Sequence, residues 1–373
     1  MSSGQSPSDN PPAVLTIDLD ALRANYRLLA KTASGARCAA AVKADGYGMG
    51  MIAVSRALAG AGCDCFFVEN PGEGVALRAA LPDATIYIVK GYYCDGPEVF
   101  LQHALRPVLV TAGQVAGWLE VIAAQGPLPS ILKVNTGMNR LGLDETDTRA
   151  LAADDSAMKS LSPDYLMSHL AFSEDPDHPM NNQQRRKFDE LRSLFPGLPA
   201  TLAGSGGVMM GSEYHYDMVR PGVGLYGGNP FSGRPNPFAE VAHLEGKILQ
   251  LREIDSGDSV GYGATHRASG PARIAIVGAG YSDGYGRGFD NRGTGILNGI
   301  KVPVVGRVSM GSVAVDVSEC PTGSIAVGDY LTLLGHGISL DAASGASGRS
   351  PYELLTSLSQ CTGRRYVGQA EGV

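Results

Sequence analysis

Short apolar runs that alternate with helical patterns constrain this chain more than any other feature of its sequence. Between residues 36 and 225 there are eight such runs, separated by segments in which apolar residues recur at helical spacing. Apolar strands separated by helices are typical of a parallel sheet, and eight strand–helix units in this length predict a (β/α)8 barrel. The runs are Cys38–Val42, Cys65–Val68, Thr85–Val89, Pro107–Val110, Ile131–Val134, Tyr165–Ser168, Pro199–Ala203 and Met218–Val219.

Helix start signals support this interpretation. Asn70 before Pro71, and Thr111 before Ala112, are residue types that cap helix N-termini, and proline is favoured at the first helical position. The clearest helical patterns are Ile52–Leu58, Val75–Leu81, Val115–Ala124 and Phe188–Phe195.

The pattern of residue types changes after about residue 240. Short β-rich runs separated by glycine and aspartate replace the helical patterns, which predicts a mostly antiparallel β domain. We therefore predict a disordered leader over residues 1–12, a barrel domain over 13–238 and a β domain over 239–373. The β-rich runs are Lys247–Leu251, Ala272–Val277, Gly295–Leu297, Val302–Val305, Val313–Val317 and Tyr330–Leu334, and a short helical pattern, Pro351–Ser359, follows them.

Composition narrows the classes of function. The net charge of −7 over 373 residues does not favour binding to nucleic acid or to an anionic membrane. No apolar run is long enough to cross a bilayer, and the leader lacks the features of a signal peptide. The six cysteines and the histidines outside the barrel strands show no metal-ligand spacing, so we expect no metal site, free thiols and a cytoplasmic protein.

The strand ends select candidate reactive residues, because barrel enzymes place them at the C-terminal ends of the strands. Lys43 ends the first run, where a neutral amine can attack a carbonyl, although an ordinary lysine also fits that place. Lys133 and His169 end the fifth and sixth runs. Gly204-Ser205-Gly206-Gly207 follows the seventh and fits either a phosphate-binding loop or a plain glycine turn, and Arg220 ends the eighth.

Six segments in order resemble motifs of the alanine racemase family, which contains pyridoxal-phosphate enzymes of fold type III. The first, residues 41–48 (AVKADGYG), resembles the family's cofactor attachment motif. The resemblance extends over nearly the whole chain after the leader. The other five segments are residues 133–142, 220–227, 260–265, 306–310 and 364–366.

The resemblance implies a role for each matching residue. Lys43 binds pyridoxal phosphate covalently and is one catalytic base, and Tyr262 is the second base on the opposite face of the substrate. His169 and Arg220 support the cofactor ring. Arg140 contacts the cofactor and the substrate carboxylate, and the Met310 backbone also binds that carboxylate. The residues implied to hold the phosphate are Tyr47, Ser205, Gly222, Val223 and Tyr366.

The resemblance also implies a partner. Lys43 and Tyr262 lie in different predicted domains, and the family forms a head-to-tail homodimer in which the tyrosine comes from the other subunit. In some members the lysine that matches Lys133 is carbamylated. Taken alone, Tyr262 in Gly-Tyr-Gly also fits an ordinary turn, and His169 also fits a structural histidine at a strand end.

The implied reaction is the interconversion of L-alanine and D-alanine, either for peptidoglycan synthesis or for alanine catabolism. Gly311 follows Met310 where the family usually has aspartate, so a broader racemase that acts on serine or lysine stays an alternative. A non-catalytic pyridoxal-phosphate-binding protein is a second alternative. Such proteins lack the β domain and its tyrosine, so the segment around Tyr262 argues against it.

Overall fold

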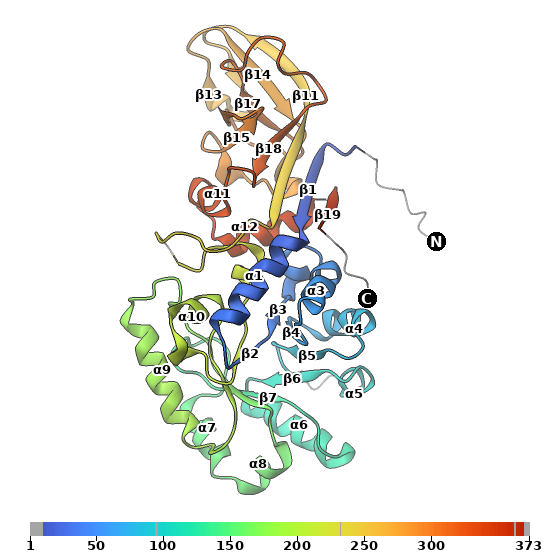
Figure 1. Cartoon of the computed structure of the whole chain (residues 1–373), viewed down its shortest axis with the longest axis vertical. Helices are drawn as coiled ribbons and strands as arrows, with labels where there is room; N and C mark the ends of the chain where they lie inside the picture. Colours follow the sequence, from blue (N-terminus) through green and yellow to red (C-terminus); the bar gives the residue numbers. More distant parts are fainter. Residues whose placement is uncertain (1–9, 94–95, 232, 362, 369–373) are drawn as a thin grey trace.

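The computed structural model describes residues 10–93, 96–231, 233–361 and 363–368. Residues 1–9 of the predicted leader lie outside the described residues, as does Cys94. The chain forms a barrel of parallel strands and, at one end of it, a second sheet that is mostly antiparallel (Figure 1). Both parts of the predicted fold class are confirmed. No helix in the described ranges is long and apolar enough to span a membrane.

The barrel closes through its first predicted strand. That run is divided at Ala39 into β2 (Arg37–Cys38), which pairs with the last strand, and β3 (Ala40–Ala41), which pairs with the second run. All neighbouring pairs in this sheet are parallel, so the eight predicted runs form a closed ring. The other strands are β4 (Cys65–Val68), β5 (Thr85–Ile88), β6 (Arg106–Leu109), β7 (Ile131–Lys133), β8 (Tyr165–Met167), β9 (Ala200–Thr201) and β10 (Met218–Val219).

Helices surround the barrel strands, as Figure 1 shows. Both predicted caps are confirmed: the side chains of Asn70 and Thr111 accept hydrogen bonds from the backbone N–H groups of Glu73 and Gln114, each at 3.1 Å. Such a cap contributes about 1 kcal/mol. The helices are α1 (Leu19–Thr32), α3 (Met51–Gly60), α4 (Pro71–Ala80), α5 (Glu98–Gln102), α6 (Ala112–Gln125), α7 (Glu145–Ala152), α8 (Asp155–Leu161), α9 (Pro179–Arg192) and α10 (Ser205–Met210).

Side chains from the strands fill the barrel interior, so the ring is a packed core rather than a pore. A buried cluster contributed by the barrel strands includes Phe67, Tyr87, Ile131, Met167 and Met218. Reactive groups therefore have space only beyond the strand ends.

The second sheet is built around the long strand β11 (Ala242–Ile254). It pairs antiparallel with β1 (Ala13–Asp18), β14 (Ala272–Val277) and β18 (Tyr330–Leu334). Its remaining strands are β15 (Thr294–Leu297), β16 (Ile300–Pro303), β17 (Val313–Asp316) and β19 (Arg364–Val367), and β12 (Ser259–Val260) and β13 (His266–Arg267) form a separate hairpin. Helices α11 (Leu340–Ser347) and α12 (Pro351–Ser357) follow β18, and α12 lies within the predicted short helix.

The N-terminal strand links the two parts of the molecule. Strand β1 pairs with β11 and β19 and not with a barrel strand, although it leads directly into α1, which packs on the barrel. The Tyr330 hydroxyl also bonds Asn10 and Pro11, each at 2.6 Å, so the end of the predicted leader is held on the second sheet. The boundary predicted near residue 238 stays a prediction.

Candidate active site

A left-handed turn follows Lys43 at the end of the first barrel strand. In α2 (Lys43–Tyr47) the φ angles of Ala44, Asp45 and Gly46 are 53°, 54° and 63°, and that of Tyr47 is 54°. A left-handed conformation costs a non-glycine residue roughly 1–2 kcal/mol. Strained backbone that the surroundings hold in place is a feature of functional sites, which supports the choice of this segment.

Two carboxylates hold the turn. Glu73 accepts a hydrogen bond from the Asp45 N–H at 3.1 Å, and the Asp45 side chain accepts one from the Met51 N–H at 2.9 Å. The other Asp45 oxygen pairs with Arg364 of β19 at 2.9 Å. The turn is thus fixed both to the barrel and to the C-terminal strand.

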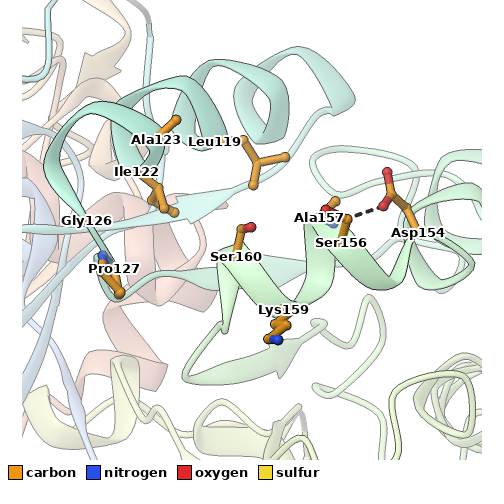
Figure 2. Close-up of a pocket in the computed structure, with 10 residues that line it drawn as sticks. All are labelled: Leu119, Ile122, Ala123, Gly126, Pro127, Asp154, Ser156, Ala157, Lys159 and Ser160. Carbon is orange, nitrogen blue, oxygen red and sulfur yellow. Dashed lines mark hydrogen bonds between the residues drawn. The ribbon is translucent and has the colours of Figure 1, made fainter.

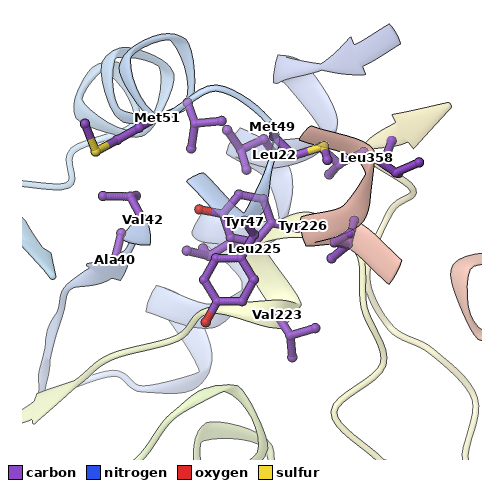
Figure 3. Packing of buried hydrophobic residues seen from close by; sticks show 14 of the residues in the cluster. Leu22, Ala40, Val42, Tyr47, Met49, Met51, Val223, Leu225, Tyr226 and Leu358 are labelled. Carbon is purple, nitrogen blue, oxygen red and sulfur yellow. The ribbon is translucent and has the colours of Figure 1, made fainter. Parts of the chain in front are cut away.

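Tyr47 ends this turn inside the protein. Its ring stacks on Tyr226 with the centroids 4.6 Å apart, and Figure 3 shows the two rings among Leu22, Leu225 and other apolar side chains. Burial raises the pKa of the Tyr47 hydroxyl above its ordinary value, so this group stays protonated and able to donate.

Lys43 is half-buried beside a carboxylate. Its Nζ lies 3.2 Å from Oε2 of Glu69, and Oε1 of Glu69 lies 3.4 Å from Nζ of Lys90. Glu69 directly follows the second barrel strand, β4, and Lys90 lies two residues beyond the end of the third, β5. The rule of strand ends could have found both, but sequence reasoning missed them because they carry no motif.

A buried cationic group lies across the same barrel mouth. Burial, and after it the charges of Arg220, Arg140 and Lys43, together lower the pKa of the Lys133 amine to about 7. His169, in the segment after β8, has a pKa well below its ordinary value because of burial and then the charge of Arg220. Its Nδ1 atom is buried and has no hydrogen-bond partner among the described residues.

The barrel wall holds Arg220 rigidly. Its Nε donates to the Thr201 hydroxyl at 2.9 Å, and its Nη2 donates to the carbonyls of Ser168 at 2.7 Å and Leu202 at 3.0 Å. Burial lowers its pKa to about 10, so the guanidinium still carries its charge at neutral pH.

Small residues after β9 and β10 form a close-packed cradle. The Ser205 hydroxyl oxygen accepts hydrogen bonds from the N–H groups of Gly222 and Gly224, each at 3.0 Å. The hydroxyl proton of Ser205 therefore remains available to a ligand. A Cβ atom on Gly222 would overlap the Tyr47 hydroxyl, so only glycine fits there. The structure thus brings Tyr47, Ser205, Gly222 and the neighbouring Val223 together.

Tyr366 has a different neighbour. Its hydroxyl donates to the Met49 carbonyl at 3.1 Å, and the residue is 40% exposed. Within the described chain no hydrogen bond joins Tyr366 to Ser205 or Gly222. The structure therefore brings Tyr366 to the loop after Tyr47 and not into the cradle.

Tyr262 and Met310 belong to the second domain and are 66% and 63% exposed. Tyr262 lies in the turn between β12 and β13, and Figure 1 shows β13 at the end of the second domain remote from the barrel strands. The Gly306–Met310 segment adjoins this turn, because a Cβ on Gly306 would lie 2.6 Å from the Val260 carbonyl. Arg140, exposed in the loop after β7, completes the set of sequence-predicted residues.

A pocket among the described residues lies away from these side chains. Figure 2 shows it on the outside of the barrel between α6 and α8, where the Asp154 side chain accepts a hydrogen bond from the Ala157 N–H at 2.9 Å. Its lining carries no cluster of reactive groups. Among the described residues, no group of three or more histidine, cysteine or acidic side chains is arranged to hold a metal.

Two models of known protein domains match consecutive parts of the chain. The model of the alanine racemase N-terminal domain matches residues 17–230, and that of the alanine racemase C-terminal domain matches residues 241–366. An alanine racemase of Rhodospirillum rubrum is 44% identical, with 98% of each chain covered. A protein of Mesorhizobium japonicum named as a catabolic alanine racemase is 42% identical, with 95% of this chain and 93% of its own covered.

A solved structure of this family has a closely similar fold. The alanine racemase of Bartonella henselae, described with covalently bound pyridoxal phosphate, superposes with a TM-score of 0.91 at 35% identity, covering 96% of this chain and all of its own. The family models together match well over half of the chain. This chain belongs to the alanine racemase family.

Proposed function

We propose that this protein is an alanine racemase that interconverts L-alanine and D-alanine with pyridoxal phosphate. The observation that carries the proposal is Lys43, held at the catalytic end of the barrel with Lys133 and Arg220 across the same opening. An amine among other cations suits a ligand that brings both a carbonyl and negative charge.

The residues present fit pyridoxal phosphate. Its phosphate would meet the hydroxyl protons of Ser205 and Tyr47 beside Gly222 and Val223, where a larger side chain would close the space. The unpartnered Nδ1 of His169 and the fixed guanidinium of Arg220 supply polar groups for the ring. Bound pyridoxal phosphate withdraws electrons from the substrate and so acidifies its α-hydrogen. Tyr366, which contacts Met49, is the least supported member of the phosphate set.

Two bases on opposite faces of the substrate account for racemisation. Lys43 holds the cofactor and exchanges the α-proton on one face, and Tyr262 exchanges it on the other. Arg140 and the Met310 N–H hold the substrate carboxylate, which keeps the α-carbon between the two bases.

The second base requires a partner subunit. Tyr262 is exposed at the end of the second domain, and Met310 beside it is equally exposed. We therefore propose a head-to-tail homodimer in which each barrel receives Tyr262 from the other subunit. Exposed large apolar side chains of this kind are typical of surfaces that become buried in an assembly.

We also propose a cytoplasmic location. The five described cysteines, Cys38, Cys63, Cys65, Cys320 and Cys361, are buried free thiols, as expected in a reducing compartment. The reaction serves peptidoglycan synthesis and alanine catabolism equally well, because both need the same interconversion.

Conversion of L-alanine to D-alanine by the purified, cofactor-loaded protein tests the proposal. Lys43→Ala and Tyr262→Phe, assayed beside it, should each lose nearly all activity. A panel of L-amino acids that includes serine and lysine tests the broader specificity that Gly311 suggests. Activity on serine or lysine without activity on alanine would overturn the assignment of the substrate.

A further inference from the structure

The Glu69 carboxylate bridges two lysines at the barrel mouth. One oxygen lies 3.2 Å from Nζ of Lys43 and the other lies 3.4 Å from Nζ of Lys90. The three side chains come from the ends of three neighbouring strands. Lys43 and Lys90 therefore share a single carboxylate.

The other ionisable groups that face this end of the barrel are mostly cationic. Lys133 is the last residue of β7, His169 lies in the segment after β8, and Arg220 directly follows β10. The charges of Arg140 and Lys43 also act on Lys133 and His169. Tyr47 is the neutral neighbour on which the Glu69 charge acts. Glu69 is thus the acidic partner that the structure gives to Lys43.

The backbone fixes Glu69 in this place. Its N–H donates to Oε2 of Glu73 at 2.7 Å, and Oε1 of the same Glu73 accepts the Asp45 N–H at 3.1 Å. One side chain therefore holds both the residue that carries the carboxylate and the turn that follows Lys43.

We propose that Glu69, with Lys90 as its second partner, is a positioning residue for Lys43: it holds the amine toward the end of β4 and sets the pH at which the amine becomes free to react. The inference rests on the proposed function, since it concerns the lysine that would hold pyridoxal phosphate. Nothing in the family resemblance assigns a role to Glu69 or Lys90.

Glu69 and Lys90 have opposite electrostatic effects on the Lys43 amine. A carboxylate near an amine favours its ammonium form, and nearby cations disfavour it. Burial alone would raise the pKa of Glu69, but the two lysines lower it overall, so the carboxylate is charged at neutral pH. When Lys43 releases its proton to water, Lys90 remains as the counter-ion of Glu69. Lys90 therefore weakens the hold of Glu69 on the Lys43 proton.

Loading of the apoprotein with the cofactor tests the inference without relying on turnover. Pyridoxal phosphate is added to apoprotein at a series of pH values, and the rate at which the absorbance of the bound cofactor appears is recorded. The variants are Glu69→Gln, Lys90→Gln and the double variant. Glu145→Gln is the matched control, because Glu145 pairs with Lys187 at 2.6 Å on the outer helices. Thermal unfolding of each apoprotein checks that the fold is kept.

Opposite shifts are expected. Glu69→Gln should lower the pH of half-maximal loading rate by roughly 0.5–1 unit, a modest shift because both side chains are partly exposed. Lys90→Gln should raise that pH, and it should do so by clearly less in the Glu69→Gln background. Glu145→Gln should match the wild type.

Three results would contradict the inference or its basis. A Glu69→Gln profile that coincides with the wild type overturns the role of Glu69. An equal shift from Lys90→Gln in both backgrounds overturns the action of Lys90 through Glu69, since it would mean that the Lys90 charge acts on Lys43 directly. A wild-type apoprotein that takes up no cofactor overturns the proposed function itself.

Discussion

The α-carbon of Gly222 lies so close to the Tyr47 hydroxyl that no side chain fits between them. Tyr47 cannot turn away easily, because it is buried and its ring stacks on Tyr226 at 4.6 Å. The segment after the last barrel strand and the turn after Lys43 are therefore closely packed against each other here. This contact sets the width of the cradle proposed for the phosphate.

Gly222→Ala should destabilise the apoprotein by about 1–3 kcal/mol, the usual range for an extra methyl group in a packed interior. Tyr47→Phe removes the oxygen that the new Cβ atom overlaps. The double variant should therefore recover part of the loss, which denaturant unfolding of all three apoproteins would measure.

The control is Gly345→Ala, which adds a Cβ atom in open space and should change the free energy of unfolding little. Gly197→Ala would not serve, because Gly197 has a φ of 81°. Strictly additive losses from Gly222→Ala and Tyr47→Phe would show that the two residues do not interact.

Lys133 should make stability depend on pH. Its pKa falls to about 7 in the folded protein, whereas the unfolded chain keeps the ordinary value of 10.5. Between these values the unfolded state binds the additional proton, so stability rises with pH, at up to about 1.4 kcal/mol per pH unit. Below about pH 7 both states are protonated, and the contribution from Lys133 no longer changes.

Lys133→Met removes this titration. Denaturant unfolding of the wild-type and variant apoproteins from neutral to alkaline pH should give a difference in free energy of unfolding that shifts in favour of the wild type as pH rises. Lys187→Met, which removes a lysine from the outer helices, should leave the slope unchanged. A constant difference across this range would show that Lys133 keeps an ordinary pKa.

The barrel could be predicted from the sequence because each of its strands has a recognisable local pattern. Each of the eight runs is apolar and short, and caps such as Asn70 and Thr111 mark where the following helices begin. Lys43, Lys133, His169 and Arg220 then follow from the rule that strand ends carry the reactive groups. These predictions needed only spacing and residue type.

Other features depend on contacts between distant residues. No local pattern shows that Ala13–Asp18 pairs with β11 and β19, because an apolar strand fits either sheet. The left-handed conformation of Ala44 and Asp45 depends on Glu73, which comes from α4. Glu69 and Lys90 carry no motif, and only the closed barrel places both beside Lys43.

A mixing experiment tests the shared active site. Lys43→Ala and Tyr262→Phe are each expected to be inactive, and exchange of their subunits produces a mixed dimer. In that dimer one site combines an intact Lys43 with an intact Tyr262 from the other subunit, so about a quarter of wild-type activity should return at full exchange. If each subunit used its own Tyr262, the mixture would stay inactive. Mixing Lys43→Ala with Lys43→Arg provides the control, since no combination of these subunits restores the lysine.

Gly311 offers a test of substrate specificity that should not disturb the fold. A Cβ on Gly311 would meet no atom within 4 Å, so a side chain has open space there. The loop around it is held independently, since the Ser309 N–H bonds the Ser312 carbonyl at 2.9 Å and the Ser282 N–H bonds the Met310 carbonyl at 2.8 Å. Gly311→Asp should therefore change the free energy of unfolding by less than about 0.5 kcal/mol, as exposed substitutions usually do.

The effect of Gly311→Asp should appear in kcat/KM instead. An aspartate beside Met310 supplies the side-chain acceptor that the family resemblance leads us to expect there, next to the N–H proposed to hold the substrate carboxylate. We expect the ratio of kcat/KM for alanine to that for serine to change severalfold. Gly311→Asn has the same shape without the charge, so a change confined to Gly311→Asp would assign the effect to the carboxylate. Equal ratios in the wild type and both variants would show that this position does not contribute to specificity.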